Sequence, residues 1–321
     1  MGRIRARISS FRMRYRVEPG LYAVGLPDED SPILVSANYK LSFDELRREL
    51  TDLNVWLLVI NTDGINVWCA AGKGTFGTVE IVNKIHDVGL DNIVKHRHII
   101  LPQLGAPGVH AHLIKKGTGF SVSFGPVFAR DIKAYLEAGY KATQAMRTVS
   151  FPLKSRLILT PIELVPAIKK FWIPALLVIL FLALKPEGIL FRDVWQQGFP
   201  FLILSLISLI LGAFLVPLLL PYIPFRSFAL KGCLSAVVVF GASFSLIKQA
   251  LNHDLWLLVA AYLLFPALVS FLSLNFTGAT TFTNISGVKK ELRISIPIYI
   301  AAAVVSGILI LIHKLLAWSV L

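Results

Sequence analysis

The chain has 321 residues, of which 55% are hydrophobic and only 16% charged, and its mean hydropathy is +0.68. This composition excludes an intrinsically disordered protein, which needs low hydrophobicity and high charge. It also excludes an ordinary soluble domain, in which about 25% of residues are charged. Residues 1–170 carry 23 Lys+Arg and 15 Asp+Glu, whereas residues 171–321 carry 9 and 4. We therefore expect a basic arm over residues 1–19, a cytosolic α/β domain over 20–160 and a transmembrane domain over 161–321.

The N-terminal arm is a run of arginines with no acidic residue before Glu18: Arg3, Arg5, Arg7, Arg12, Arg14 and Arg16. No apolar stretch follows, so the arm does not read as a cleavable signal peptide. Beside a membrane domain, such a run is expected to bind the anionic lipids of the cytoplasmic leaflet. Nucleic acid is not expected as a partner, because no interleaved aromatic residues or binding motif accompany the charge.

The soluble half alternates short β-rich runs with helical patterns. Strands are expected over residues 32–36, 55–60, 98–101 and 119–124. Helices are expected from a capping box at Ser42–Glu45 to about Leu53, over 78–87 closed by Gly89, over 109–116 ending at Gly117, and over 129–138 ending at Gly139. This order predicts an α/β domain with a mostly parallel sheet. In such sheets ligands bind beyond the carboxyl ends of the strands.

The segment after the 55–60 strand is therefore where chemistry is expected. It is rich in glycine, which permits a close approach of the backbone to a ligand, but Lys73 is followed by Gly74 and no phosphate-binding Walker loop is present. Cys69 sits at the start of a short helix-like run over 66–71, where a helix N-terminus favours a thiolate, and a thiolate is a strong ligand for soft metals. The alternative is that Cys69 is an inert packed residue, as many cysteines are.

Other metal sites find less support. The only other cysteine is Cys233, expected to be a small buried residue of a membrane helix, so this chain is not expected to hold an iron–sulfur cluster, which usually needs four thiolates. His96 and His98 would share one face of a strand, but no acidic or thiol partner accompanies them. A zinc site there is not expected.

The second half contains five apolar stretches, expected to span the membrane over about residues 168–184, 199–221, 228–247, 255–275 and 294–317. The first is short for a helix that must cross about 30 Å of hydrocarbon, and its flanking lysines could extend its reach. Five spans place seven basic residues on the cytosolic side, namely Lys169, Lys170, Arg226, Lys231, Lys289, Lys290 and Arg293. Lys185, Arg192, Lys248 and Lys314 then lie outside, in agreement with the positive-inside rule. This topology puts the C-terminus on the outer side of the inner membrane.

A polar segment, residues 275–291, joins the last two spans. Its threonines, asparagines and glycines cannot face lipid without partners. One interpretation is a cytosolic turn in which Ser286 or Asn284 caps a short helix. The other is a polar surface at the membrane mouth, facing the soluble domain.

The run Asn66-Val-Trp-Cys-Ala-Ala-Gly-Lys73 resembles the cap-helix motif of the mercury-methylating corrinoid protein family at all eight positions. The flanks Ser36–Asp44 and Gly74–Thr78 resemble that family too, as does Asn275–Val288 in the membrane half. The soluble half is also similar to the corrinoid domain of the corrinoid iron–sulfur proteins, which lack the cap cysteine and the membrane half. The resemblance implies a Rossmann-like corrinoid-binding domain followed by about five transmembrane helices.

The resemblance further implies that Cys69 is the lower ligand of cobalt in a cobalamin-type corrinoid and the catalytic residue. The other expected cofactor-binding residues are Thr62, Gly64, Asn66, Val67, Trp68, Ala70, Ala71, Gly72 and Lys73. The implied reaction is methyl transfer to Hg(II), forming methylmercury in an anaerobic cell. The implied partners are a methyltetrahydrofolate-linked methyl donor system and a ferredoxin-like protein with two 4Fe–4S clusters.

Two other functions remain open from the residues. The chain could be a membrane-bound corrinoid methyl carrier for another one-carbon acceptor. It could also be a non-enzymatic membrane binding protein in which Cys69 is structural.

Overall fold

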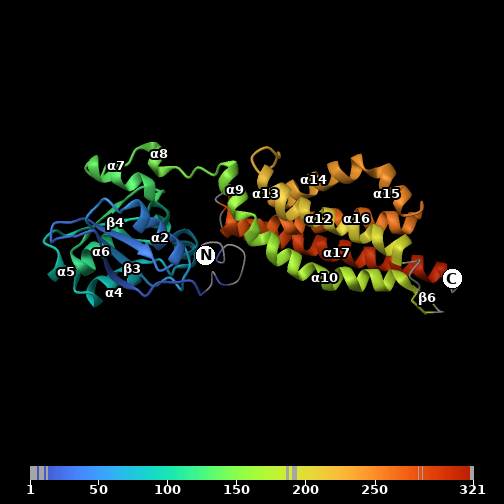
Figure 1. Cartoon of the computed structure of the whole chain (residues 1–321), viewed down its shortest axis with the longest axis horizontal. Helices are drawn as coiled ribbons and strands as arrows, with labels where there is room; N and C mark the ends of the chain where they lie inside the picture. The colour runs from blue at the N-terminus through green and yellow to red at the C-terminus, as the bar shows by residue number, and fades with distance from the viewer. Residues whose placement is uncertain are drawn as a thin grey trace. The chain divides into compact units, whose positions relative to one another are not determined.

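The computed structural model describes residues 6, 11, 14–185, 188–189, 194–280, 282–283 and 285–318. The chain divides into two compact units, Met1–Ser150 and Phe151–Leu321 (Figure 1). The division falls before α9 (Leu153–Leu159), which packs against helices of the second unit, rather than after residue 160. Most of the predicted basic arm, including Arg3, Arg5, Arg7 and Arg12, lies outside the described residues.

The first unit is built on a five-stranded sheet with the order β1-β3-β2-β4-β5. Its strands are β1 (Gly20–Val24), β2 (Ile33–Ala37), β3 (Val55–Ile60), β4 (His98–Leu101) and β5 (Ser121–Phe124). Strands β2 to β5 are parallel, as predicted. Strand β1 was not predicted; it pairs antiparallel with β3 at the sheet edge, with Gly20 opposite Val59.

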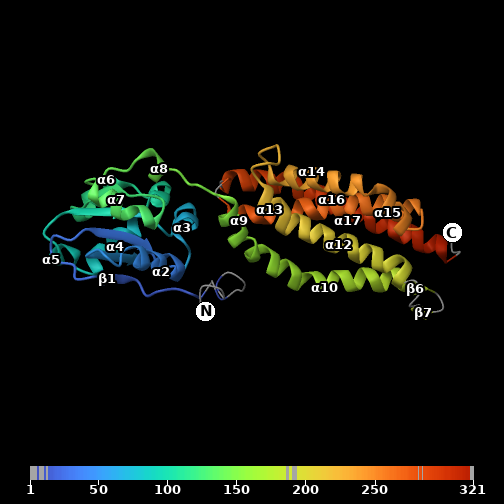
Figure 2. The ribbon, with the colours of Figure 1, turned by 45° about the horizontal axis from the view of Figure 1, so that its top comes forward.

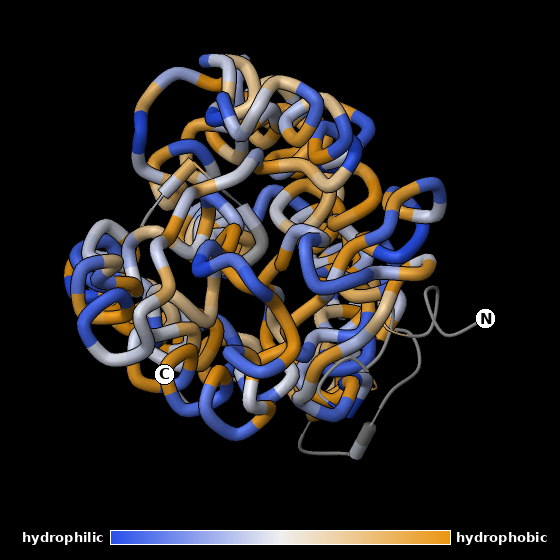
Figure 3. The backbone as a smooth tube through the Cα atoms, turned by 90° about the vertical axis from the view of Figure 1, so that its left-hand side faces the viewer, coloured by the Kyte–Doolittle hydropathy of each residue, from blue (hydrophilic) through white to orange (hydrophobic). Residues whose placement is uncertain are grey.

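Helices cover both faces of this sheet (Figures 1 and 2). On one face α3 (Val67–Lys73), α4 (Thr78–Asp87), α5 (Leu90–Ile93) and α6 (Ala111–Thr118) enclose a core that includes Leu58 and Ile60. On the other, α2 (Lys40–Glu49) and α7 (Ile132–Glu137) enclose a core that includes Leu57 and Val59. Successive side chains of a strand point to opposite faces, so a strand apolar at every position requires a sheet covered on both sides. Hydrophobic stretches alternate with hydrophilic turns along the backbone (Figure 3).

The boundaries of three predicted helices were wrong. Helix α2 begins at Lys40 after Tyr39, which makes no side-chain cap, so Ser42 lies inside the helix and the capping box does not form; the helix ends at Glu49. Helix α6 runs past Gly117 and ends at Gly119, whose positive φ of 79° suits glycine. The 129–138 segment begins as the 3-10 turn η3 (Ala129–Asp131) before α7. The remaining short elements are η2 (Gln103–Gly108) and α8 (Gln144–Arg147).

The second unit is a bundle of long apolar helices. After α9 come α10 (Pro161–Ala183), a two-stranded turn of β6 (Leu184–Lys185) and β7 (Gly188–Ile189), and a helix composed of η4 (Val194–Gly198), α12 (Phe199–Ile210), η5 (Leu211–Leu215) and α13 (Val216–Leu219). Then follow α14 (Phe228–Ala242), α15 (Phe244–Ala250), α16 (Leu255–Asn275), η6 (Phe276–Ala279) and α17 (Ile285–Ala317). Four helical stretches of the described chain are long and apolar enough to cross a membrane, or five if α14 and α15 form one broken span.

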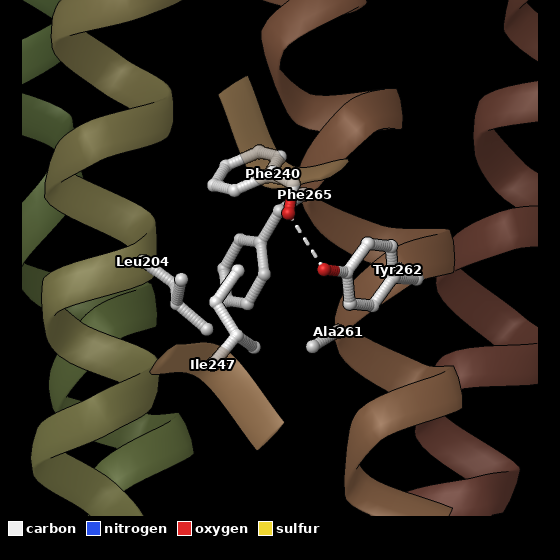
Figure 4. A pocket seen from close by; sticks show the side chains of 6 residues that line it. All are labelled: Leu204, Phe240, Ile247, Ala261, Tyr262 and Phe265. Carbon is white, nitrogen blue, oxygen red and sulfur yellow. Dashed lines mark hydrogen bonds between the residues drawn. The ribbon is translucent and has the colours of Figure 1, made fainter. Parts of the chain in front are cut away.

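The structure changes the description of two predicted spans. The first is no longer short, because α9 and α10 together run over Leu153–Ala183. The third bends by 71° between α14 and α15. At the bend the Tyr262 hydroxyl donates to the Phe240 carbonyl at 2.7 Å, beside an apolar pocket with no room for a water molecule (Figure 4).

The polar segment after α16 is a short turn. Thr277 and Thr280 are buried in it, and the Phe282 ring contacts that of Phe151, with centroids 5.7 Å apart. Ser286 lies within the first turn of the 33-residue α17 rather than at its cap. The other predicted cap, Asn284, lies outside the described residues.

Candidate functional site

The predicted motif lies at the carboxyl edge of the parallel strands. The loop after β3 leads into α3, which carries Cys69, and η2 follows β4 and packs against α3. This is the edge at which open α/β sheets bind their ligands.

Helix α3 is short but is held at both ends. The Asn66 side chain accepts a hydrogen bond from the backbone N–H of Cys69 at 2.9 Å, as an N-cap residue does. At the other end Gly74 adopts a left-handed φ of 84°, and its N–H reaches the carbonyls of Ala70 and Ala71. A seven-residue helix is marginal by itself, so these caps and its packing determine where Cys69 lies.

The buried face of α3 consists of small residues. Ala70 and Ala71 are buried in the core of the first unit, with Val67 packed against it. A methyl group added to Gly108 of η2 would lie 3.1 Å from the Ala71 Cα and 2.4 Å from the Phe76 carbonyl oxygen. The backbones of α3 and η2 therefore approach as closely as glycine permits.

The other motif residues face outward to different degrees. Cys69 and Trp68 are half-buried, whereas Asn66, Gly72 and Lys73 are exposed. Both cysteines of the chain are described, and neither is in a disulfide. Cys69 therefore lies between the packed face and the open face of the helix, where its thiol can meet a ligand that covers α3.

Thr62 and Gly64 are buried in the loop before α3 and hold its shape. The Asn38 Oδ1 atom accepts from the Thr62 N–H at 3.0 Å, from the Gly64 N–H at 2.9 Å, and lies 2.9 Å from the Thr62 hydroxyl oxygen. Sequence reasoning missed Asn38. Its position directly after a buried strand, like that of Asn61, was the available signal.

His96 and His98 both form hydrogen bonds within the α/β domain. The Nε2 atom of His96 lies 2.9 Å from the Ser31 carbonyl, and that of His98 lies 2.7 Å from the Ser123 hydroxyl. Burial, and secondarily the charge of His96, lowers the pKa of His98. Among the described residues no group of three or more His, Cys, Asp or Glu side chains is placed to hold a metal ion.

The surroundings of α3 fit a large amide-bearing ligand such as a corrinoid. Thr75 follows the helix and Gln103 begins η2, and the Thr75 Oγ1 and Gln103 Oε1 atoms are buried with no hydrogen-bond partner in the described structure. Buried polar atoms are nearly always bonded, so each orphan requires an explanation. A corrinoid carries amide groups around its ring, which are the kind of hydrogen-bond partner that these two atoms lack, and a soft thiolate suits its cobalt.

The first unit matches the family model described as CO dehydrogenase/acetyl-CoA synthase delta subunit over residues 10–136. It is 32% identical over 131 residues to the acetyl-CoA decarbonylase/synthase complex subunit gamma of Archaeoglobus fulgidus, which is 40% of this chain and 27% of that protein. It is 35% identical over 125 residues to the corrinoid/iron-sulfur protein large subunit of Moorella thermoacetica, 38% of this chain and 28% of that protein.

These matches confirm the predicted similarity of the α/β domain to corrinoid iron–sulfur proteins. The chain spans about a quarter of the length of the curated relatives it matches. The family-model match falls on residues 10–136, in the α/β part, and the matches to the two relatives cover 40% and 38% of this chain. The mercury-methylating resemblance, which rests on the Cys69 motif and the membrane half, remains a prediction.

Proposed function

We propose that the first unit binds a cobalamin-type corrinoid, with the Cys69 thiolate as lower cobalt ligand, and that the chain transfers a methyl group from it to inorganic Hg(II). The observation that carries the proposal is a half-buried thiol on a capped short helix, at the ligand-binding edge of a domain similar to corrinoid proteins. The eight-residue motif around Cys69 is the reason for choosing mercury as the acceptor.

A bound corrinoid would supply a cobalt atom able to carry a methyl group. The residues of the chain position and tune it. Asn66 holds the Cys69 backbone, so the thiol keeps one position relative to the sheet. A thiolate donates more electron density to a metal than an imidazole does, which favours release of a methyl group toward an electrophile such as Hg(II).

The remaining motif residues would shape the lower face of the cofactor. Ala70 and Ala71 fix α3 against the core, and Gly72 leaves room on its outer side. Trp68 and Lys73 are the larger side chains available to contact the ring or its substituents. Thr62 and Gly64 would act through the loop that carries α3.

Electrons and methyl groups must come from partners. Two cysteines cannot supply the four thiolates that an iron–sulfur cluster usually needs, and they lie in different units. We therefore propose a ferredoxin-like partner with two 4Fe–4S clusters as the reductant, and a methyltetrahydrofolate-linked system as the methyl donor. The apolar helices would anchor the complex in the inner membrane, with the first unit in the cytosol and the C-terminus outside.

The second candidate function is a membrane-bound corrinoid methyl carrier for another one-carbon acceptor. It is favoured by the similarity to acetyl-CoA decarbonylase/synthase subunits, which concerns only the first unit. It shares the Cys69 ligand and differs only in the acceptor.

The test uses the full chain, purified anaerobically and loaded with methylcobalamin, mixed with Hg(II), with methylmercury measured by mass spectrometry. We expect product from the native chain, a nearly complete loss in Cys69→Ala, and little change in Cys233→Ala, which removes the other thiol of the chain. Bound corrinoid without product, even with the ferredoxin-like partner added, would favour the carrier function. Failure to bind corrinoid would refute both candidates.

A further inference from the structure

The second unit contains a buried cation, two of whose nitrogen atoms have no hydrogen-bond partner in the described structure. Arg156, on α9, is 2% exposed. Its Nε and Nη1 atoms are both inaccessible to solvent and have no hydrogen-bond partner in the described structure. An unpaired charge in such a position is costly, and so is breaking a buried ion pair by removing one partner. A guanidinium kept in this state therefore indicates an anion that binds it.

The two unbonded donors of Arg156 are buried, and one exposed side chain lies over the guanidinium that carries them. The Tyr222 ring lies over the guanidinium, with its centroid 5.8 Å from the guanidinium carbon. This contact uses the face of the guanidinium, so it gives no hydrogen-bond partner to the N–H groups, which lie in the plane of the guanidinium. Tyr222 is 74% exposed and lies on the loop between α13 and α14, so it can move aside to admit a ligand.

Other positive side chains gather at the same end of the bundle. The loop that carries Tyr222 is joined to α17 by Ser227, whose hydroxyl donates to Glu291 at 2.8 Å, and Glu291 also accepts from the Ala229 N–H. Around these tethers the exposed cations are Lys154, Arg226, Lys289, Lys290 and Arg293. Their combined field raises the local concentration of anions.

The position of Arg156 identifies the kind of anion. It lies near the beginning of the apolar stretch Leu153–Ala183, which is long enough to cross a membrane. A side chain near the end of a span is at the level of the lipid headgroups, where basic residues meet phosphate. Arginine is the residue best suited to phosphate, because its several N–H donors can bond more than one phosphate oxygen.

We propose that Arg156 is a phosphate-binding site, occupied by the headgroup of an anionic phospholipid, with Tyr222 as its movable cover. The site is independent of the corrinoid and of the acceptor of the methyl group. It ties α9, the helix at the start of the membrane unit, to the lipid surface.

The test compares the thermal unfolding of the full chain, delipidated in neutral detergent, with added phosphatidylglycerol, phosphatidylcholine or inorganic phosphate. Phosphatidylglycerol should raise the melting temperature of the native chain more than phosphatidylcholine does. Arg156→Gln should bind phosphatidylglycerol about tenfold more weakly, which corresponds to the loss of one charged hydrogen bond. Lys248→Gln, which removes an exposed cation on α15 that is not part of this group, should bind as the native chain does.

Additional comparisons test the proposal even if one variant fails to fold. Without lipid, Arg156→Gln should melt no lower than the native chain, because it removes an unpaired buried charge. If that variant does not fold, native mass spectrometry of the native chain and of Arg156→Lys still compares retention of the two lipids. Equal stabilisation by inorganic phosphate would support the phosphate site but assign it to a soluble phosphate ester. Equal binding of both lipids by the native chain, or unchanged phosphatidylglycerol binding in Arg156→Gln, would overturn the proposal.

Discussion

The close contact between α3 and η2 predicts that Gly108→Ala will disturb the helix that carries Cys69. The added methyl group would lie 2.4 Å from the Phe76 carbonyl oxygen, whereas real contacts of this kind are not shorter than 3.0 Å. The backbone must therefore separate by at least 0.6 Å, from 2.4 to 3.0 Å. Phe76 is fully buried and the Ala71 Cα is only 3.1 Å from the same methyl group, so neither neighbour can easily yield.

Overpacking of this kind costs about 1 to 3 kcal/mol. If that cost falls on local opening of α3, backbone amides of Val67–Lys73 should exchange hydrogen about 5- to 150-fold faster, since 1.4 kcal/mol is a factor of ten. Hydrogen–deuterium exchange of the full chain, read by mass spectrometry, measures this directly. Bound corrinoid should also be retained less well.

The matched control is Gly117→Ala, in α6 of the same unit. Its added methyl group would meet the Val82 side chain at 3.5 and 3.6 Å, which is ordinary contact. Alanine is favoured over glycine inside a helix, so exchange should be unchanged or slower. Native exchange rates throughout α3 in Gly108→Ala would refute the argument that this glycine sets the position of the helix.

Three other predictions concern single side chains. Asn66→Ala should weaken α3 by about 1 kcal/mol and lower the retention of bound corrinoid. Asn66→Asp keeps the hydrogen-bond acceptor and should retain corrinoid as the native chain does. Equal retention by both variants would contradict the role of Asn66 as a cap. The pKa of His98 is lowered by burial, so protons favour the unfolded chain, and the melting temperature should fall as the pH drops below about 6.5. His98→Asn should show a smaller fall, and an identical pH profile would exclude His98 as the cause. Cys233→Ala should melt within a few degrees of the native chain, because the half-buried Cys233 acts as a small apolar residue of α14. A large drop in melting temperature would contradict this.

The amino-acid sequence by itself determined the elements whose local signals agree. Strand β3 is apolar at every position, which is possible only in a sheet covered on both faces. Helix α4 occupies the predicted residues Thr78–Asp87, and the predicted stop, Gly89, follows it with a positive φ of 59°. The site helix was predicted over residues 66–71 and runs over Val67–Lys73, between the cap residues Asn66 and Gly74.

Tertiary structure decided what depends on pairing across the chain. Strand β1 carries a weak local pattern and exists because β3 offers an open edge to it. Asn38 is an ordinary polar residue in the sequence, and only the meeting of the loops after β2 and β3 gives it three donors. The burial of Arg156 and the bend after α14 likewise depend on neighbours far away in sequence. Local sequence propensity cannot predict these contacts, because they form only when the helices and strands pack.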